Sequence, residues 1–201
     1  MNTRPNADMV AMVVGIIESL VPQALPRAED VATLARHREW LLGIEDEVVV
    51  LFYDTLYAYS TTAEVFVPGE RPAREQTLRH WWQRTVGTPI DLTYYRWMCL
   101  VGIVHIRRKV TNPMMLSMLQ VVTEHVVTRA GADLGASEAW ALQQALGRLT
   151  TAVGAIIAES YTIGYVGALE DLAGLDPKLT ERMLQLELKR LEEQGRDQLG
   201  G

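Results

Sequence analysis

The segment that decides the fold reads Val101-Gly102-Ile103-Val104-His105-Ile106-Arg107-Arg108-Lys109. It places one imidazole on an apolar, helix-forming stretch and follows it at once with three cations. A neutral imidazole is a good iron ligand, an apolar helix face can cover a flat macrocycle, and cations on the next turn can pair with carboxylates at its rim. The pattern therefore suits an axial iron ligand beside a porphyrin. A packed core histidine is the alternative for the same position.

The composition limits the class of protein. The chain has 201 residues, 48% of them hydrophobic and 22% charged, which allows one substantial core but not two typical domains with a linker. A net charge of −6 argues against nucleic acid as a partner, although Arg107, Arg108 and Lys109 form a local basic cluster. Cys99 is the single cysteine, so no disulfide framework is expected and a reducing, cytoplasmic location fits.

The two ends of the chain differ in character from its middle. The apolar run from Met9 to Val21 is shorter than a membrane span and is broken by Glu18, so we expect an amphipathic helix and no membrane insertion, with export as the alternative. Leucines alternate with charges over 178–193, which predicts an amphipathic terminal helix, either a surface tail or a short docking segment. We therefore expect an N-terminal extension (1–26), one globular domain (27–170) and a C-terminal amphipathic helix or tail (171–201).

Prolines and glycines divide the sequence into helical pieces, and the alternation typical of strands is hard to find, so we predict an all-α fold. The expected helices are 9–21, 28–42, 45–59, 72–86, 91–110, 112–131, 137–165 and 178–193. Asn112 is the expected cap of the helix that continues with Pro113. Tyr53 is expected beside the buried stripe of helix 45–59, which comprises Val48, Leu51, Phe52, Thr55 and Leu56.

Three segments of this chain resemble the globins, and most closely the protoglobins and the sensor domains of globin-coupled sensors. They are Asp46–Asp54, Leu78–Trp81 and Tyr94–Lys109, and the resemblance covers the chain from about Asp30 to Tyr165. It implies a globin fold of the sensor-globin or protoglobin type, with an extra N-terminal helix and a C-terminal tail. It also implies haem b (iron protoporphyrin IX) as the cofactor and reversible binding of O2, CO and NO.

The resemblance assigns roles to four residues. In that family the histidine of the Val-Gly-x-x-His pattern is the proximal haem ligand, which matches His105 as the metal-binding residue. The tyrosine of the first segment points into the distal pocket and can donate a hydrogen bond to the bound gas, which matches Tyr53. The aromatic residue before it matches Phe52, and the distal wall residue matches Leu78. An O–H donor in an otherwise apolar wall suits a bound dioxygen that carries partial negative charge.

Further residues extend this candidate site. Haem contact is expected from Trp81 and Met98, with ordinary core packing as the alternative for both. Arg108 is expected to pair with a propionate, with a solvated helix end as the alternative. Arg74 stands where a vertebrate-type globin offers a distal histidine; it is expected to be an exposed helix-start residue, or else to reach a propionate or the ligand. His80 is expected at the surface, with bis-histidine coordination as the alternative.

These expectations favour a gas sensor or a stand-alone protoglobin over an enzyme, and no catalytic residue is assigned. Resemblance to sensor globins implies a homodimer through the last two long helices, G and H, where Ala145, Ala152 and Ile156 are expected to face outward. Two alternatives stay open. One is NO dioxygenation or peroxidase-like chemistry with an external reductase, and the other is a haem-free globin-fold interaction module.

Overall fold

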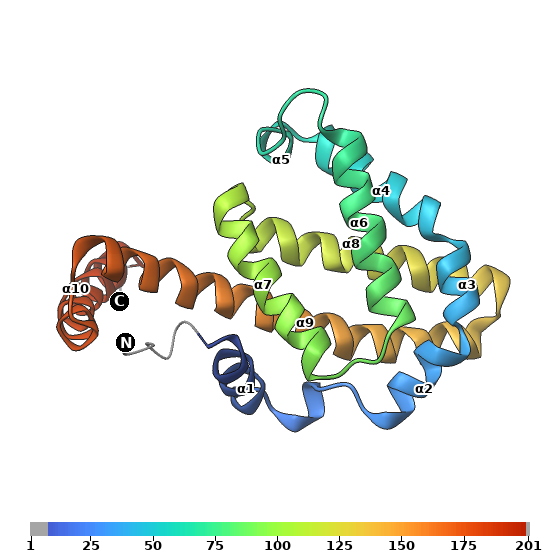
Figure 1. Cartoon of the computed structure of the whole chain (residues 1–201), viewed down its shortest axis with the longest axis horizontal. Coiled ribbons are helices and arrows are strands. Elements are labelled where there is room, and N and C mark those ends of the chain that lie inside the picture. Colours follow the sequence, from blue (N-terminus) through green and yellow to red (C-terminus); the bar gives the residue numbers. More distant parts are fainter. Residues whose placement is uncertain (1–7, 200–201) are drawn as a thin grey trace. The chain divides into compact units, whose positions relative to one another are not determined.

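The computed structural model describes residues 8–199, and within them it forms helices without strands. The prediction of an all-α fold is therefore confirmed. The elements in chain order are α1 (Met9–Ser19), the short 3-10 helix η2 (Pro22–Ala24), α2 (Ala28–Arg36), α3 (Arg38–Gly43), α4 (Glu45–Ala58), α5 (Ser60–Ala63), α6 (Arg71–Gly87), α7 (Leu92–Arg108), α8 (Asn112–Asp133), α9 (Ala136–Ala173) and α10 (Pro177–Leu199) (Figure 1).

The helix starts follow from local side-chain chemistry. The Asp8 carboxylate accepts from the Val10 N–H at 2.8 Å, and the Asp91 carboxylate accepts from the Tyr94 N–H at 2.9 Å, so each satisfies a free amide at a helix start. The predicted cap of α8 was wrong by one residue. Thr111, rather than Asn112, has extended backbone and accepts from the Met114 N–H, because a residue inside the first turn cannot serve as its cap.

The predicted helix over 28–42 is two helices, α2 and α3, which are separated at His37. His37 leaves the helical conformation with ψ near 10°, and its Nε2 lies 2.7 Å from the Glu138 Oε2 of α9. The short helix α5 was not expected. The chain divides into two compact units between Tyr161 and Thr162, and the site described below lies wholly in the first unit.

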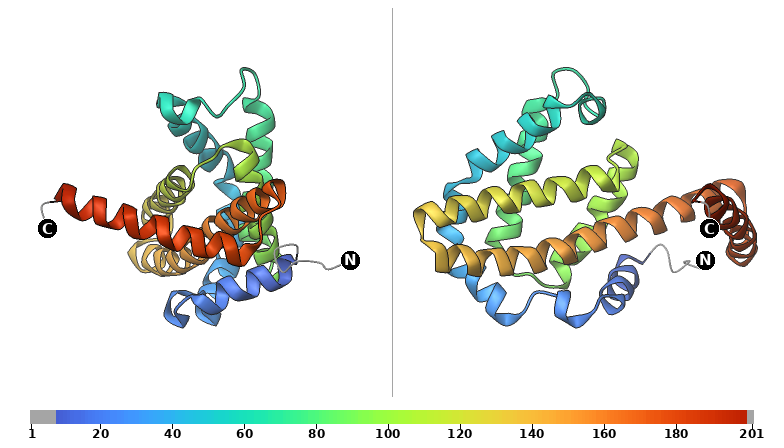
Figure 2. Two further views of the ribbon diagram at one scale, coloured as in Figure 1. Left: turned by 90° about the vertical axis from the view of Figure 1, so that its left-hand side faces the viewer. Right: turned by 180° about the vertical axis from the view of Figure 1, so that it is seen from behind.

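Helix α9 supplies much of the core of the first unit. Its buried apolar side chains recur at spacings of three and four residues; they are Leu142, Ala145, Leu146, Leu149, Ala152, Val153, Ile156 and Ile157. Ala145, Ala152 and Ile156 are fully buried, so the expectation that they face outward was wrong: they share the inward face set by this periodicity. Helix α8 runs antiparallel beside this part of α9 (Figures 1 and 2).

Length and composition alone would allow α9 to cross a membrane, and the same holds for α1 and Pro22–Arg36 taken together despite a bend of 105° between them. Core helices of globular domains and N-terminal signal segments meet the same criteria. In α9, 39% of the apolar window is buried inside the chain, so core packing accounts for part of its hydrophobicity.

Two contacts fix α7 and α2 against α9 on what we call the packed side of the first unit. A Cβ atom added at Gly102 of α7 would meet Ser160 Oγ at 2.1 Å and the Ile157 carbonyl oxygen at 2.5 Å, so only glycine fits at this crossing. The Asp30 carboxylate of α2 accepts from Arg148 Nε at 2.6 Å and Arg148 Nη2 at 2.5 Å. Each contact joins residues that are far apart in sequence. Together they hold α2 and α7 against α9, next to the cavity described below.

The second unit contains the end of α9 and the whole of α10. Gly174 has a φ of 63°, which allows the chain to turn after α9. The Asp176 carboxylate then accepts from the N–H groups of Lys178 and Leu179 at the start of α10. The leucines of α10 are exposed, which agrees with the amphipathic helix predicted from the sequence, although α10 is longer than expected.

Candidate functional site

A large cavity of about 570 Å³ opens within the first unit. Its volume falls within the range of about 300–1,000 Å³ that is usual for small-molecule and cofactor sites. The lining comes from α4, the segment before α6, α6 itself, α7 from Trp97 onward, the link to α8, the first half of α8, and one residue of α9. The lining residues are Phe52, Tyr53, Leu56, Val65, Phe66, Ala73, Arg74, Gln76, Thr77, Leu78, His80, Trp81, Trp97, Leu100, Val101, Val104, His105, Arg108, Val110, Met114, Met115, Met118, Leu119, Val122 and Ile157.

His105 stands in the wall of this cavity on the last turn of α7. Its Nδ1 atom is buried and, within the described part of the chain, has no hydrogen-bond partner. Burial lowers the pKa of the imidazole to about 4, because desolvation disfavours the charged form. The ring is therefore neutral at pH 7, which is the form that ligates metals.

Gly102 explains why His105 is held in place. It lies one turn before the histidine, at the point where α7 touches the backbone of α9. The close contact at Gly102 fixes the position of α7, so the Val-Gly-x-x-His pattern combines a helix-crossing residue with the imidazole one turn further on. This pairing gives a physical reason for the spacing in the motif.

Tyr53 of α4 lines the same cavity and is 5% exposed. It lies on the buried stripe rather than beside it, because Val49, Tyr53 and Leu56 share one face of the helix. Its hydroxyl donates to the Arg74 carbonyl oxygen at 2.7 Å. Burial raises the pKa of this hydroxyl well above its ordinary range, so it stays protonated and remains an O–H donor in the cavity wall.

Around Tyr53, apolar side chains form one continuous wall. Leu78 is buried in a cluster with Val49, Tyr53, Leu56 and Met118, and the partly buried Phe52 and Trp81 pack against it. Phe52 meets the Tyr53 ring edge-on, with the ring centroids 5.3 Å apart. The structure thus brings Phe52, Tyr53, Leu78 and Trp81 to one cavity together with His105, whereas the sequence separates them by up to 53 positions.

Met98 lies elsewhere. It is fully buried and is not among the cavity-lining residues, so the expected haem contact has no geometric support. The reason is that α7 is buried on two adjacent faces: Trp97, Val101 and Val104 face the cavity, whereas Met98 lies with Gly102 on the face beside it. Core packing, the alternative, describes Met98.

Arg108 lines the cavity at the end of α7, and its Nη2 atom donates to both carboxylate oxygens of Glu70 at 2.7 Å. Arg74 Nε also donates to Glu70, at 3.2 Å. The Val67 N–H and the Arg108 guanidinium hold the pKa of the Glu70 carboxyl below its usual range. Arg74 is thus part-buried and lines the cavity, rather than being the exposed residue that was expected.

His80 is exposed and meets Trp97 edge-on at the rim of the cavity, with the ring centroids 6.0 Å apart. Two further features of the site were missed by sequence reasoning. Val65 and Phe66 come from the segment before α6, which carries no motif, and Glu70 gave no signal beyond being an acidic residue near a helix start. No group of three or more His, Cys, Asp or Glu side chains among residues 8–199 could hold a metal ion.

The donor set fits a haem. A neutral imidazole can supply one axial ligand, the apolar walls can bury the macrocycle, and the part-buried cation Arg108 stands where a carboxylate could reach it. The buried Nδ1 of His105 has no hydrogen-bond partner among residues 8–199, so no hydrogen bond at this atom orients the ring. The chemistry of the cavity therefore agrees with a globin-type haem pocket.

Comparison with known protein families gives the same answer. The family model described as Protoglobin matches residues 27–165, which is more than half of the chain. No curated protein matches the sequence. The matched range includes α2 to α8, the part of α9 that lines the cavity, and every side chain of the site described above. The chain therefore belongs to the protoglobin family, whose members are globin-type proteins that bind haem and small gas molecules.

Proposed function

We propose that this protoglobin binds haem b in the 570 Å³ cavity through His105 and takes up O2, CO or NO reversibly, as a gas sensor or gas carrier. The observation that carries the proposal is the neutral imidazole of His105, whose buried Nδ1 has no partner among the described residues while the ring borders a large apolar cavity. Haem iron, when bound, supplies an open coordination position for a diatomic gas.

The residues of the chain do the remaining work. His105 provides a lone pair on the imidazole, because its depressed pKa keeps a proton from competing for it near neutral pH. The wall around Leu78, Phe52 and Trp81 is apolar, so it would exclude water and cover the macrocycle of a bound haem. Arg108 offers its guanidinium to a propionate, and Glu70 keeps that guanidinium in place through two hydrogen bonds.

Tyr53 supplies the O–H donor for a polar occupant of the cavity. A tyrosine hydroxyl carries a single hydrogen, and in this structure that hydrogen goes to the Arg74 carbonyl oxygen. Donation to the gas therefore means that Tyr53 exchanges one acceptor for another. The hydroxyl does not ionise in this exchange, since burial keeps its pKa far above neutral pH.

The test is absorption spectroscopy of the full chain reconstituted with haemin, then reduced with dithionite and exposed to CO. We expect one haem per chain and a large shift of the ferrous spectrum on CO. His105→Ala should abolish the five-coordinate ferrous spectrum, whereas His80→Ala, a change to the other histidine of the same cavity, should preserve it. Absence of stoichiometric haem uptake, or uptake that is equal in wild type and His105→Ala, would contradict the proposal and favour a haem-free interaction module.

We also propose that the chain forms a homodimer through α8 and the first part of α9, which correspond to the G and H helices. Large apolar side chains remain exposed on both, including Leu116 (48%) and Trp140 (61%). Light scattering coupled to size-exclusion chromatography should show a dimer whose dissociation constant rises in Trp140→Ala. A monomeric mass at every concentration tested would contradict this proposal.

A further inference from the structure

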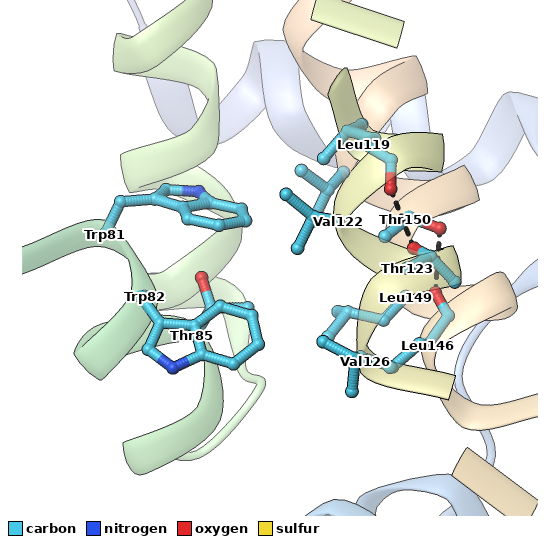
Figure 3. A pocket seen from close by; sticks show the side chains of 11 residues that line it. Trp81, Trp82, Thr85, Leu119, Val122, Thr123, Val126, Leu146, Leu149 and Thr150 are labelled. Carbon is cyan, nitrogen blue, oxygen red and sulfur yellow. Dashed lines mark hydrogen bonds between the residues drawn. The ribbon is translucent and has the colours of Figure 1, made fainter. Parts of the chain in front are cut away.

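A second open space, which we call the loop cleft, lies where α6 ends and α7 begins. Its volume is about 470 Å³, and its walls are the second half of α6, the connecting segment 88–91 and the first turn of α7. Trp81, Trp82 and Thr85 point from α6 toward α8 and α9 (Figure 3), so the loop cleft uses a different face of α6. Of its lining residues, only His80 also borders the haem cavity, and most of its lining side chains are polar or charged.

Hydrogen bonds inside the protein hold the floor and the rim of the loop cleft. Tyr94 lies at the bottom and is 1% exposed, and its hydroxyl donates to Thr85 Oγ1 at 3.2 Å, which joins α7 to α6. On the rim, the Gln83 amide donates to Glu45 Oε1 at 3.1 Å. The Thr88 hydroxyl donates to a carbonyl oxygen of α6 at 2.7 Å. These bonds fix the shape of the loop cleft.

Two charged side chains of the loop cleft have no charged partner. Within residues 8–199, Arg84 forms no ion pair with a carboxylate and Asp91 forms none with a cation. They do not pair with each other either, so more than 4.0 Å separates the nitrogens of Arg84 from the carboxylate oxygens of Asp91. Arg79, on the same helix, pairs with the carboxylates of both Glu45 and Asp46. The loop cleft thus keeps one cation and one anion apart.

Each of these two charges is held in place by a contact other than an ion pair. The Arg84 guanidinium lies over the Trp97 ring, with Cζ 4.6 Å from the ring centroid, which is a cation–π contact. The Asp91 carboxylate caps α7 through one oxygen, which accepts from the Tyr94 N–H at 2.9 Å. A cation–π contact leaves the guanidinium N–H donors unused, and the cap leaves one carboxylate oxygen unused. Both groups therefore keep hydrogen-bonding capacity for a ligand.

We propose that the loop cleft binds a small zwitterion, a molecule with a carboxylate at one end and an ammonium group at the other, such as an amino acid. The carboxylate accepts hydrogen bonds from the Arg84 guanidinium, and the ammonium group donates to the unused oxygen of Asp91. A simple anion satisfies Arg84 but is repelled by Asp91, and a simple cation has the opposite problem. The site involves no haem, so its test is independent of the proposed gas binding.

The experiment is an NMR titration of the ¹⁵N-labelled full chain, with and without haemin, using glycine, β-alanine and γ-aminobutyrate. These three probes carry the same two charges at increasing separations. At least one of them should shift the Trp97 indole N–H and the Thr93 amide signals in a saturable way. The acid and the amine with the same carbon skeleton as the best probe should each bind at least tenfold more weakly, because each lacks one charge-assisted hydrogen bond.

Variants of the two charged residues test the site itself. Arg84→Gln and Asp91→Asn should each weaken binding of the best probe at least tenfold, whereas Arg96→Gln should leave it unchanged. Arg96 is the matched control, because it is an exposed arginine of α7 that does not line the loop cleft. Asparagine can still cap α7, so Asp91→Asn provides the test should Arg84→Gln fail to fold.

Two results would overturn the proposal whatever the outcome with haem. Absence of saturable shifts in the wild type, or equal affinities in Asp91→Asn and Arg96→Gln, would show that the loop cleft is not a binding site. An acid or an amine that binds as tightly as the zwitterion with the same skeleton would show that the two charges do not act together on one ligand.

Discussion

The two buried faces of α7 differ in what fills the space beside them. On the packed side, Gly102 touches the backbone of α9 and Met98 is fully buried, so the protein fills this space with its own atoms. On the cavity side, Val101, Val104 and His105 border about 570 Å³ that the described side chains leave open. The contrast teaches that one helix can carry stability on one face and reserve room for a cofactor on the other.

Two arginine–carboxylate pairs repeat this difference. Asp30 on the packed side is 2% exposed and makes two bonds to Arg148. Glu70 on the cavity side also makes two bonds, but its partner Arg108 lines the cavity and is available to another anion. The first pair holds α2 to α9, whereas the second positions the Arg108 guanidinium at the edge of the site, where it can pair with an anion.

The largest expected effect is that of Asp30→Asn. Removing one partner of a buried ion pair typically costs about 3–5 kcal/mol, and we expect urea unfolding at pH 7 to show a loss of this order. The exposed neighbour Glu29 is the control, and Glu29→Gln should cost less than about 1 kcal/mol. A loss in Asp30→Asn no larger than that in Glu29→Gln would break the contrast between the two sides.

The same pair predicts a pH dependence. Arg148 holds the pKa of the Asp30 carboxyl below its ordinary value of 3.8. The stabilisation is therefore fully present above pH 3.8 and is lost as the pH falls through the lowered pKa. The difference in unfolding free energy between wild type and Asp30→Asn should shrink over that acidic range, as measured by urea titrations at successive pH values.

The two faces of α7 can be compared directly by truncation. Met98→Ala should cost about 2–5 kcal/mol of stability because it opens a void in a closed core, with little change in haem affinity. Val104→Ala should cost less stability and weaken haem binding, since Val104 borders the cavity. Haemin titration and urea unfolding of both variants test this, and equal losses of haem affinity would contradict the assignment of faces.

Gly102→Ala should destabilise the chain by about 1–3 kcal/mol, because the new methyl group would press on the Ile157 carbonyl oxygen and force the helices apart. Gly147→Ala is the matched control: it lies in α9 with open space around a new Cβ, and alanine there should stabilise the helix by up to about 1 kcal/mol. Thermal unfolding should show a lower melting temperature for Gly102→Ala and a higher one for Gly147→Ala. An unchanged melting temperature in Gly102→Ala would contradict the helix-crossing explanation of the motif.

The smallest expected effect is that of Tyr53→Phe, which keeps the ring and removes the O–H donor. The haem-loaded variant should release oxygen about tenfold faster, which corresponds to about 1.4 kcal/mol, while haem uptake stays unchanged. Stopped-flow measurement of oxygen dissociation tests this. An unchanged dissociation rate would show that the hydroxyl serves only the Arg74 carbonyl oxygen.

The sequence predicted those features that depend on local patterns. The helical pieces followed from apolar spacing, and the resemblance to protoglobins selected His105, Tyr53 and Leu78, which the structure brings to one cavity. The side of a helix on which a buried residue lies was harder to predict from the sequence. The position of Met98 depends on how α1 and α9 pack against α7, and the burial of Ala145 depends on which face of α9 the rest of the first unit covers. Both outcomes depend on contacts between distant segments.

Charged residues show the same limit. Asp30 was recognisable from the sequence as an acidic residue near the start of a helix, yet its partner Arg148 lies 118 positions away. The pairing of Glu70 with Arg108 likewise spans 38 positions and joins the residue before α6 to the end of α7. Single-sequence patterns report the helix on which a charge lies, whereas its partner is set by the tertiary fold.

The claim that His105 reserves its imidazole for haem iron is tested most directly by resonance Raman spectroscopy of the ferrous, haem-loaded chain. The account predicts an iron–histidine stretching band that disappears in His105→Gly and returns when imidazole is added to that variant. A band that persists unchanged in His105→Gly would show that another side chain ligates the iron, and would contradict the account.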